Sequence, residues 1–384
     1  MSDHKTTSAA KIFVSAGEAS GDLHAANLIR AAARLCPSAE FAALGGPSIA
    51  AAGARLLHNM LGRFAVMGLV DALRVAPAIT RLRNETLRFL DSWQPAAAVL
   101  VDYPGFNLNL ALHLKRRGIP VFYYICPQVW AWAPWRIKKI ARRIDKALVV
   151  FPFETDLYAN ARIPVEYVGH PLGDVFAAAD LDREFLEKGE LASAPLVIAL
   201  LPGSRAAEIE RNFPVQAAAA RIIKTALPDA AFAVPVTTQE HAAVVTKLAA
   251  DARLDCHVYV GKTYEVMSLS SFALATSGTA TLELAHFGVP MVVLYRTNPG
   301  GLFLKKTLVT TPHIALVNIV AGRQIVPELV YWRDRSQFIA RLALDVLNDP
   351  ARLDLMRRDV RAVGALIDSP GASETAARAI LSAL

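Results

Sequence analysis

Short runs of aliphatic and β-branched residues recur along the chain, each followed by a longer stretch in which apolar residues have helical spacing. Runs of continuous apolar character are typical of parallel strands that helices cover on both faces. A first series predicts strands at residues 11–17, 41–46, 96–103, 121–126, 146–152 and 165–169. A second series predicts strands at residues 196–204, 231–236, 256–261, 272–278 and 290–296. Each series therefore predicts a doubly wound α/β unit.

A charged stretch with poor periodicity follows Pro171 and Gly173 and separates the two series. Because such a break marks a domain boundary, we expect a first domain at residues 1–172 and a second at 173–350. After Pro327 the pattern is helical to the end of the chain. Ligands of open α/β sheets bind beyond the carboxyl ends of the strands, so chemistry is expected at strand-to-helix turns, in a cleft where the two units face each other.

Length and composition agree with two buried cores. The chain has 384 residues, of which 54% are apolar and 20% charged, so it is too long for one ordinary core and too apolar for a disordered protein. The formal charge of +7 favours an anionic partner, without distinguishing nucleic acid, lipid headgroups and phosphorylated metabolites. The three cysteines lie far apart and form no CxxC pair, which argues against a disulfide framework or a zinc knuckle and fits a reducing cytoplasm.

The polar start of the chain predicts no signal peptide, and any membrane contact is expected to be peripheral. Apolar stretches are either shorter than the ~20 residues of a spanning helix or interrupted by charges and Ser, Thr and Gly clusters. We also predict no metal, since the nine histidines show no HExxH or comparable spacing. Asp180 and Asp182 form an Asp-x-Asp pair, but it lies in the boundary segment away from any strand end, where a solvated face is the simpler interpretation.

One turn in the second unit could bind an anion. Gly203 permits close backbone approach, Ser204 can cap the following helix, and Arg205 supplies a bidentate cation beside the helix N-terminus. An ordinary turn with a surface arginine is the alternative.

A second turn adds the features of a nucleotide-diphosphate site. Ser277, Gly278 and Thr279 end a strand with hydroxyl and N–H groups that suit a phosphate. Glu283 follows about one helical turn later, and its carboxylate can accept both hydroxyls of a ribose. It could instead only complement the helix dipole.

The first unit opens with SAGEASGDLHAANL, whose glycines fit neither GxGxxG nor a phosphate loop ending in Gly-Lys-Ser/Thr. This argues against a dehydrogenase or a kinase. Glu18, Asp22 and His24 stand at the predicted helix start, either as candidate chemistry or as groups that match the helix dipole.

Asp102 stands at the carboxyl end of a strand that otherwise contains Ala, Val and Leu. A carboxylate in this place is a candidate general base, because partial burial raises its pKa toward neutral pH. A turn-capping aspartate before Pro104 is the alternative.

Three tryptophans, Trp130, Trp132 and Trp135, stand directly before a run with five cations between Arg136 and Arg143. From Arg136 onward the apolar residues have the i, i+3, i+4 spacing of one buried stripe, which predicts a basic amphipathic helix. A core stripe with a solvated face is the plain alternative. Indole rings beside cations are, however, typical of the membrane interface.

A second segment, residues 60–84, includes Phe64 and Met67 among four arginines and is richer in apolar groups than a surface helix needs. It could hold an acyl chain or dip into lipid. Single-stranded nucleic acid also binds aromatic side chains beside cations. No RNP, KH or helix-turn-helix pattern accompanies them, so we predict no nucleic-acid partner.

The chain resembles the lipid-A-disaccharide synthase family in six segments that cover nearly its whole length, in the family's order and spacing: SAGEASGDLHAANL, DYPGFN, CPQVWAWAPWRIKKI, LPGSRAAEIERN, TSGTATLELAHFGVPMVVLYR and LVNIVAGRQIVPEL. The VWAW segment with its basic tail and the GEASGD turn are the most specific of these. Many nucleotide-sugar enzymes share the Gly-Ser-Arg and Ser-Gly-Thr turns.

The resemblance implies an inverting glycosyltransferase of the GT-B type, with two facing Rossmann-like domains and neither cofactor nor metal. It implies transfer of 2,3-diacylglucosamine from its UDP derivative to the 6-hydroxyl of 2,3-diacylglucosamine 1-phosphate (lipid X), which forms the β-1,6 disaccharide of lipid A and UDP. A cytoplasmic protein on the inner leaflet of the inner membrane is expected, with a homodimer as its suggested state. In many GT-B enzymes a terminal helix returns to the first domain, which would place residues from about 351 to 384 there.

The resemblance also implies roles for five residues: Asp102 as the base or acceptor-positioning acid, Glu18 as the acid of the first turn, Arg205 as the diphosphate arginine, Glu283 as the ribose acid and Asn318 as the asparagine of the NxxAGR stretch. Some relatives carry a second acid where this chain has Gly105, so any role of that acid is absent here. Either Asp102 or Glu18 could take the acceptor proton.

Two other classes of function remain open from the sequence. One is another nucleotide-sugar enzyme of GT-B architecture, such as a UDP-N-acetylglucosamine 2-epimerase or a peptidoglycan-type N-acetylglucosaminyltransferase. The other is a non-catalytic peripheral membrane or RNA-binding protein with a degenerate nucleotide fold.

Overall fold

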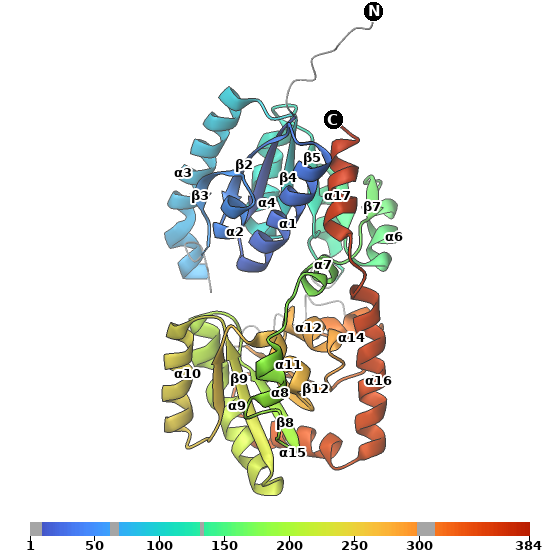
Figure 1. Ribbon diagram of the computed structural model, residues 1–384. Helices are drawn as coiled ribbons and strands as arrows, with labels where there is room; N and C mark the ends of the chain where they lie inside the picture. Colours follow the sequence, from blue (N-terminus) through green and yellow to red (C-terminus); the bar gives the residue numbers. More distant parts are fainter. Residues whose placement is uncertain (1–9, 62–68, 131–133, 298–311) are drawn as a thin grey trace, which may run out of the picture. The chain divides into compact units, whose positions relative to one another are not determined.

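The computed structural model describes residues 10–61, 69–130, 134–297 and 312–384, the side chains of residues 69–75 excepted. The chain divides into two compact units (Figure 1). Unit 1 contains Met1–Ala177 together with Ser369–Leu384, and unit 2 contains Ala178–Asp368.

Unit 1 is built on a seven-stranded parallel sheet with strand order β3-β2-β1-β4-β5-β6-β7. The strands are β1 (Lys11–Ala16), β2 (Glu40–Gly45), β3 (Arg55–Asn59), β4 (Ala97–Val101), β5 (Val121–Tyr124), β6 (Lys146–Val149) and β7 (Val165–Tyr167). The helices are α1 (Ala19–Leu35), α2 (Pro47–Ala51), α3 (Leu69–Trp93), α4 (Pro104–Lys115), α5 (Ile137–Ala141), α6 (Pro152–Asn160), α7 (Leu172–Ala177) and α17 (Ala372–Leu381).

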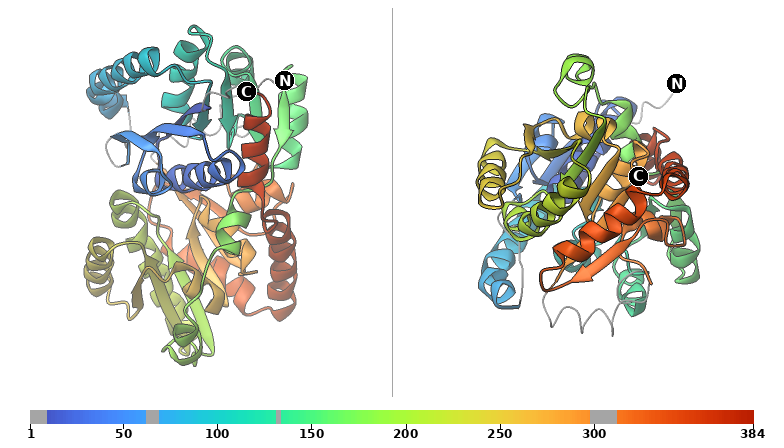
Figure 2. Two further views of the ribbon diagram at one scale, coloured as in Figure 1. Left: turned by 45° about the horizontal axis from the view of Figure 1, so that its top comes forward. Right: turned by 90° about the horizontal axis from the view of Figure 1, so that it is seen from below.

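Helices cover both faces of this sheet (Figures 1 and 2). On one face α3 and α4 pack over a buried core that includes Phe13, Leu90, Leu100 and Leu110. On the other face α1 packs against α17. The strands between these layers are apolar on both sides, which is the physical origin of their continuous hydrophobic runs.

Unit 2 repeats the plan with a six-stranded parallel sheet of order β10-β9-β8-β11-β12-β13. The strands are β8 (Leu196–Leu201), β9 (Ala230–Val236), β10 (His257–Val260), β11 (Phe272–Thr276), β12 (Met291–Arg296) and β13 (Glu328–Tyr331). The helices are α8 (Arg183–Lys188), α9 (Ala206–Ala226), α10 (Gln239–Asp251), α11 (Thr263–Leu269), α12 (Ala280–His286), α14 (Leu316–Val320), α15 (Ser336–Leu347) and α16 (Pro350–Ile367).

The strand order reverses once in each sheet, between β1 and β4 in unit 1 and between β8 and β11 in unit 2. At such a point the helices that follow the two central strands leave toward opposite faces, so the ends of the strands open a crevice that ligands occupy. The turns that the sequence singled out follow β1, β4, β8 and β11. Strand order therefore gathers them into one pair in each unit.

Two strands are absent from the sequence prediction. β3 and β13 lie at sheet edges, and most of their residues are only partly buried. An edge strand has one open side and tolerates polar residues, so its hydrophobic run is short and interrupted. The expectation of helices alone after Pro327 is wrong for the same reason, since β13 pairs with β12 there.

The chain returns to unit 1 later than about residue 351, because α16 belongs to unit 2 and only Ser369–Leu384 belongs to unit 1. Gly364 permits close packing of α16 on α12, since a Cβ there would lie 2.3 Å from the carbonyl oxygen of Ala285. In unit 1 the carboxylate of Asp174 accepts hydrogen bonds from the N–H groups of Gly371 and Ser373 at the start of α17.

Candidate active site

Asp102 and Tyr103, directly after β4, both have left-handed backbone conformations, with φ of 44° and 48°. The surrounding structure holds this turn in place. The N–H of Asp102 donates to the carbonyl of Tyr124 at 3.1 Å, and its carbonyl accepts from the hydroxyl of Tyr123 at 2.7 Å and from Nδ2 of Asn107 at 2.8 Å. Uncommon backbone conformations that several bonds support are concentrated at functional sites.

The carboxyl group of Asp102 is largely buried, and burial raises its pKa to about 6, with a further rise from the negative charge of Glu18 and a smaller decrease from the N–H of Tyr103. A carboxylate with this pKa is ionised at neutral pH and is a stronger base than an exposed aspartate. The two turns also pack closely, since a Cβ on Gly17 would lie 2.1 Å from the ring of Tyr103. The sheet thus brings together two acids that the sequence could only name separately.

The other two polar residues of the first turn have structural surroundings. Asp22 is buried, and its carboxylate accepts hydrogen bonds from the N–H groups of Gly46 at 2.6 Å and Ser48 at 2.9 Å, which caps α2. His24 is buried, and burial lowers its pKa to about 4. Of the three, Glu18 alone acts on the pKa of Asp102.

In unit 2 the turn after β8 carries Gly203 with φ of 127°, a conformation that favours glycine. Arg205 begins α9 as its N-cap residue, and its side chain is 46% exposed. The carboxylate of Glu208 accepts a hydrogen bond from the N–H of Ser204 at 3.1 Å and lies 3.4 Å from a guanidinium nitrogen of Arg205. The protein itself therefore supplies an anion to the Ser204 N–H and to Arg205 in this turn.

The turn after β11 has an open backbone at Gly278, where an added Cβ would meet no atom within 4 Å. The Ser277 hydroxyl donates to the carbonyl of Ile314 at 3.1 Å, so its oxygen keeps only acceptor capacity for a ligand. Thr279 precedes α12 and accepts the first hydrogen bonds of that helix. This turn offers a ligand backbone and hydroxyl groups rather than charge.

Glu283 lies in the first turn of α12, where burial raises the pKa of its carboxyl group. The hydroxyl of Tyr264 donates to its Oε1 at 3.3 Å, which opposes that rise. One hydrogen-bonded oxygen leaves the other with acceptor capacity for a pair of vicinal hydroxyls. In the described part of the chain, no three His, Cys, Asp or Glu side chains are grouped so that they could hold a metal ion.

Asn318 is fully buried, and its side chain binds its own loop. Its Nδ2 donates to the carbonyl of Val326 and to Oε2 of Glu328, each at 3.0 Å, and its Oδ1 accepts from the N–H groups of Ile325 and Val326. These four bonds saturate a carboxamide. Asn318 therefore holds the segment before β13 in shape.

The aromatic part of unit 1 is partly packed and partly exposed. Trp130 donates from Nε1 to Oε1 of Glu154 at 3.0 Å and meets the ring of Phe153 edge-on, with centroids 5.2 Å apart. Trp135 is 59% exposed. Trp130 is thus anchored in unit 1, whereas Trp135 presents an indole ring to solvent.

The basic segment after Trp135 is amphipathic, as its spacing predicts. Ile140 and Ile144 are buried, while Arg136 and its neighbouring lysines are exposed. The helix is short, because α5 follows a 3₁₀ turn at Pro134–Arg136 and ends at Ala141. The other predicted members of the acceptor or membrane surface, Trp132, Phe64 and Met67, lie outside the described residues.

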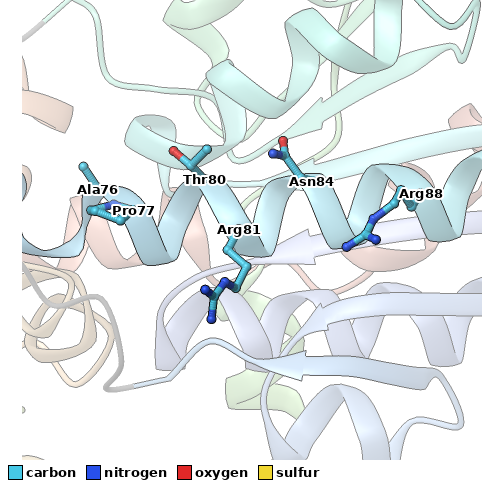
Figure 3. Close-up of a pocket in the computed structure, with 6 residues that line it drawn as sticks. All are labelled: Ala76, Pro77, Thr80, Arg81, Asn84 and Arg88. Atoms are coloured by element: carbon cyan, nitrogen blue, oxygen red, sulfur yellow. The ribbon is translucent and has the colours of Figure 1, made fainter.

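A surface hollow of about 640 Å³ runs along α3 (Figure 3). Its lining combines two arginines with polar and small side chains: Ala76, Pro77, Thr80, Arg81, Asn84 and Arg88. Among the helices of the described residues, none combines the length and the apolar character that crossing a bilayer requires.

Three residues at these sites were not singled out by the sequence analysis: Asn107 and Tyr264, which bond to Asp102 and Glu283, and Glu208, beside Arg205. For two of them a local signal exists, because Asn107 closes the DYPGFN segment and Glu208 lies three residues after Arg205. Tyr264 reaches Glu283 from α11, and only the fold brings these helices together.

Comparison with known sequences gives one result over nearly the whole chain. The family model described as lipid-A-disaccharide synthetase matches residues 12–365. The lipid-A-disaccharide synthase of Geobacter metallireducens is 38% identical over 374 residues, which are 97% of each chain. That of Syntrophus aciditrophicus is 36% identical over 367 residues, covering 95% of this chain and 96% of the relative.

Comparison with solved structures gives the fold. The UDP-GlcNAc 2-epimerase of Neisseria meningitidis, solved with UDP-GlcNAc, has a TM-score of 0.62 and 13% identity, with 97% of this chain and all of that chain covered. Acinetobacter baumannii MurG has a TM-score of 0.55 and 13% identity, with 97% and 99% covered. At such identities the likeness shows the fold alone, and it confirms the predicted α/β architecture of the GT-B type with two Rossmann-like domains.

Proposed function

Because the chain belongs to the lipid-A-disaccharide synthase family, we propose that it transfers 2,3-diacylglucosamine from UDP-2,3-diacylglucosamine to the 6-hydroxyl of lipid X. The products are the β-1,6-linked lipid A disaccharide 1-phosphate and UDP. The structural observation that carries this mechanism is the largely buried Asp102, with its raised pKa, beside Glu18 at the opening of the unit 1 sheet.

Asp102 acts as the general base. The acceptor O6 forms a bond to C1 of the donor sugar while its proton passes to the Asp102 carboxylate, and the bond from C1 to the diphosphate oxygen breaks with both electrons leaving on UDP. This displacement inverts the configuration at C1. Glu18 supports the step by its negative charge, which raises the basicity of Asp102.

Unit 2 holds the leaving group. Arg205 supplies positive charge to the diphosphate, and the turns at Gly203–Ser204 and Ser277–Thr279 supply N–H and hydroxyl groups. Glu283, oriented by Tyr264, accepts the ribose hydroxyls. Asn318 contributes indirectly through Glu328, because its Nδ2 donates to the Glu328 carboxylate. That carboxylate also accepts from the N–H of Ile314, and the Ile314 carbonyl accepts from the Ser277 hydroxyl. With this charge and these dipoles, the transfer needs no divalent ion.

Unit 1 receives the acceptor and meets the membrane. Trp135 and Arg136 place an exposed ring beside an exposed cation, and Trp130 anchors the segment. Trp132, Phe64 and Met67 lie outside the described residues and belong to the proposal on the sequence pattern alone. Such a surface favours peripheral binding, from the cytoplasm, to the anionic inner leaflet. Both acylated substrates are expected to be held in that leaflet by their acyl chains.

The test is incubation of purified protein with UDP-2,3-diacylglucosamine and lipid X in EDTA, with UDP and disaccharide measured separately. We expect one UDP per disaccharide, unchanged turnover with EDTA, and a fall of at least about 10²-fold for Asp102→Ala and for Arg205→Ala. Wild-type product from the double variant would show a different site. A dimeric mass in solution would support the homodimer that we also propose.

A second assay separates the alternative enzymes. Conversion of UDP-N-acetylglucosamine to an epimer, without any acceptor, would indicate the 2-epimerase reaction. Transfer to a peptidoglycan precursor would indicate the other transferase. We expect neither product.

A further inference from the structure

We propose that Asn107 is the positioning residue of the catalytic turn: its carboxamide joins the ends of β1 and β4 and so fixes Asp102 relative to Glu18. This inference rests on the proposed role of Asp102 as the base. It concerns a residue whose side chain faces the protein interior and touches no substrate in the proposed reaction.

Asn107 lies in the first turn of α4, and its side chain is completely buried. Its Nδ2 lies 2.8 Å from the carbonyl oxygen of Asp102, 3.1 Å from that of Val101 and 3.2 Å from that of Ser15. Its Oδ1 accepts a hydrogen bond from the Ser15 hydroxyl at 2.7 Å. One carboxamide therefore contacts both strands that flank the reversal of strand order.

The register between β1 and β4 ends at the pair Ala16 and Val101. The two segments continue into α1 and α4, and at this end of the register the Asn107 carboxamide bonds to both of them. A carboxamide suits this place, since it donates and accepts at once without a charge in a buried site. Removing it takes one hydrogen-bond partner from the Ser15 hydroxyl and from the carbonyl groups of Ser15, Val101 and Asp102.

Asn107 bonds directly to the backbone of Asp102, the residue that carries the reacting carboxylate. The Asp102 carbonyl accepts hydrogen bonds from two side chains, those of Asn107 and Tyr123. Asp102 itself has an uncommon left-handed backbone conformation. With one donor lost, the turn can relax toward an ordinary conformation. The carboxyl group would then turn toward water and away from Glu18, which lies three residues beyond Ser15.

Unit 2 has a carboxamide in a similar place. Nε2 of Gln216, from α9, lies 3.2 Å from the carbonyl of Leu201 in β8 and 3.2 Å from that of Leu274 in β11. In each sheet, a buried amide side chain thus joins the two central strands. Only in unit 1 does it also bond to a residue with a proposed chemical role.

The experiment compares Asn107→Ala with Leu114→Ala, a cavity variant at a completely buried position in the last turn of the same helix. Thermal unfolding first confirms that both variants fold. If Asn107→Ala does not fold, Ser15→Ala replaces it, because that variant removes only the hydroxyl that orients the amide.

For Asn107→Ala we expect kcat to fall about 10²-fold with the donor KM within about twofold, because a misplaced base slows chemistry and leaves donor binding intact. We also expect the acid limb of kcat to move to lower pH, as Asp102 becomes better hydrated. For Ser15→Ala we expect the same changes at smaller size, and for Leu114→Ala neither.

A double variant tests whether Asn107 acts through Asp102. In the Asp102→Asn background, Asn107→Ala should reduce the remaining activity by less than about threefold, since the group that it positions is gone. A full further loss in that background, or equal kinetics and pH profiles for Asn107→Ala and Leu114→Ala, would overturn the proposal. Wild-type activity of Asp102→Asn itself would instead refute the assigned base. The two failures are therefore distinguishable.

Discussion

In unit 2, Glu208 places one carboxylate oxygen 3.1 Å from the backbone nitrogen of Ser204 and the other 3.4 Å from a guanidinium nitrogen of Arg205. The groups that we assign to the donor diphosphate thus bind a negative charge of the protein itself. A diphosphate and this carboxylate compete for the same donors. We therefore infer that Glu208 weakens the binding of the donor diphosphate at this turn.

We predict that Glu208→Gln lowers the donor KM about threefold. The amide oxygen of the variant can still accept a hydrogen bond from the Ser204 N–H. The repulsion between the Glu208 carboxylate and the donor diphosphate disappears, and for partly exposed charges that repulsion is worth about 0.6 kcal/mol. Steady-state kinetics measure the change. Glu210→Gln, an exposed acid of the same helix, is the control and should leave KM unchanged. A higher KM for Glu208→Gln would mean that Glu208 chiefly orients Arg205.

The pH dependence of kcat should show an acid limb near pH 6. Asp102 must be ionised to accept a proton, and burial together with Glu18 raises its pKa to about 6, so activity falls as pH falls through that value. Glu18→Gln removes the neighbouring negative charge and should move the limb to lower pH. A limb that stays in place in this variant would show that another group controls it.

Asp102→Asn should stabilise the protein at neutral pH. The pKa is about 6 in the folded state against 3.8 as the ordinary value, so the folded state disfavours the ionised form, and the penalty is absent below pH 3.8 and complete above about pH 6. Two pKa units correspond to about 3 kcal/mol, of which we expect about 1–2 kcal/mol after solvent relaxation. Urea unfolding of both proteins at pH 4 and pH 7.5 measures it. A gain of equal size at both pH values would exclude this electrostatic cause.

Tyr264→Phe should weaken donor binding about threefold to tenfold. The variant removes the hydroxyl that donates to Glu283 and leaves a buried carboxylate with fewer partners and a pKa that is raised further. Inhibition by UDP and by 2′-deoxy-UDP separates the causes, because a loss through the ribose contact weakens UDP more. Tyr259→Phe, a tyrosine of β10, is the control. Equal losses for both inhibitors would contradict the ribose assignment.

Trp135→Ala combined with Arg136→Glu should weaken binding to vesicles that contain anionic phospholipid about tenfold or more. The variant removes an exposed ring and reverses a charge near the lipid surface, where each cation contributes about 1 kcal/mol. Cosedimentation measures binding. Trp332→Ala with Arg333→Glu is the matched control, since unit 2 presents the same pair, with the Arg333 guanidinium 3.9 Å from the Trp332 ring centroid. Equal losses for both pairs would refute a specific unit 1 surface.

The amino-acid sequence by itself predicted the central strands, the two doubly wound units and the turns that carry the candidate chemistry. These features are local. A strand buried on both faces must be apolar along its length, and a ligand-binding turn must have small and polar residues directly after its strand. The family resemblance rests on the same local segments, and these segments contain Asp102, Glu18, Arg205 and Glu283.

Only the tertiary structure decided which of these groups act on one another. Strand order placed Glu18 beside Asp102, and packing put Tyr264 on Glu283 and Glu208 on Ser204. It also showed that the Asn318 side chain is saturated inside its loop, that β3 and β13 complete the sheet edges, and that α17 but not α16 belongs to unit 1. These relations join residues far apart in the chain, and they depend on burial and hydrogen bonding that no local pattern of polar and apolar positions encodes.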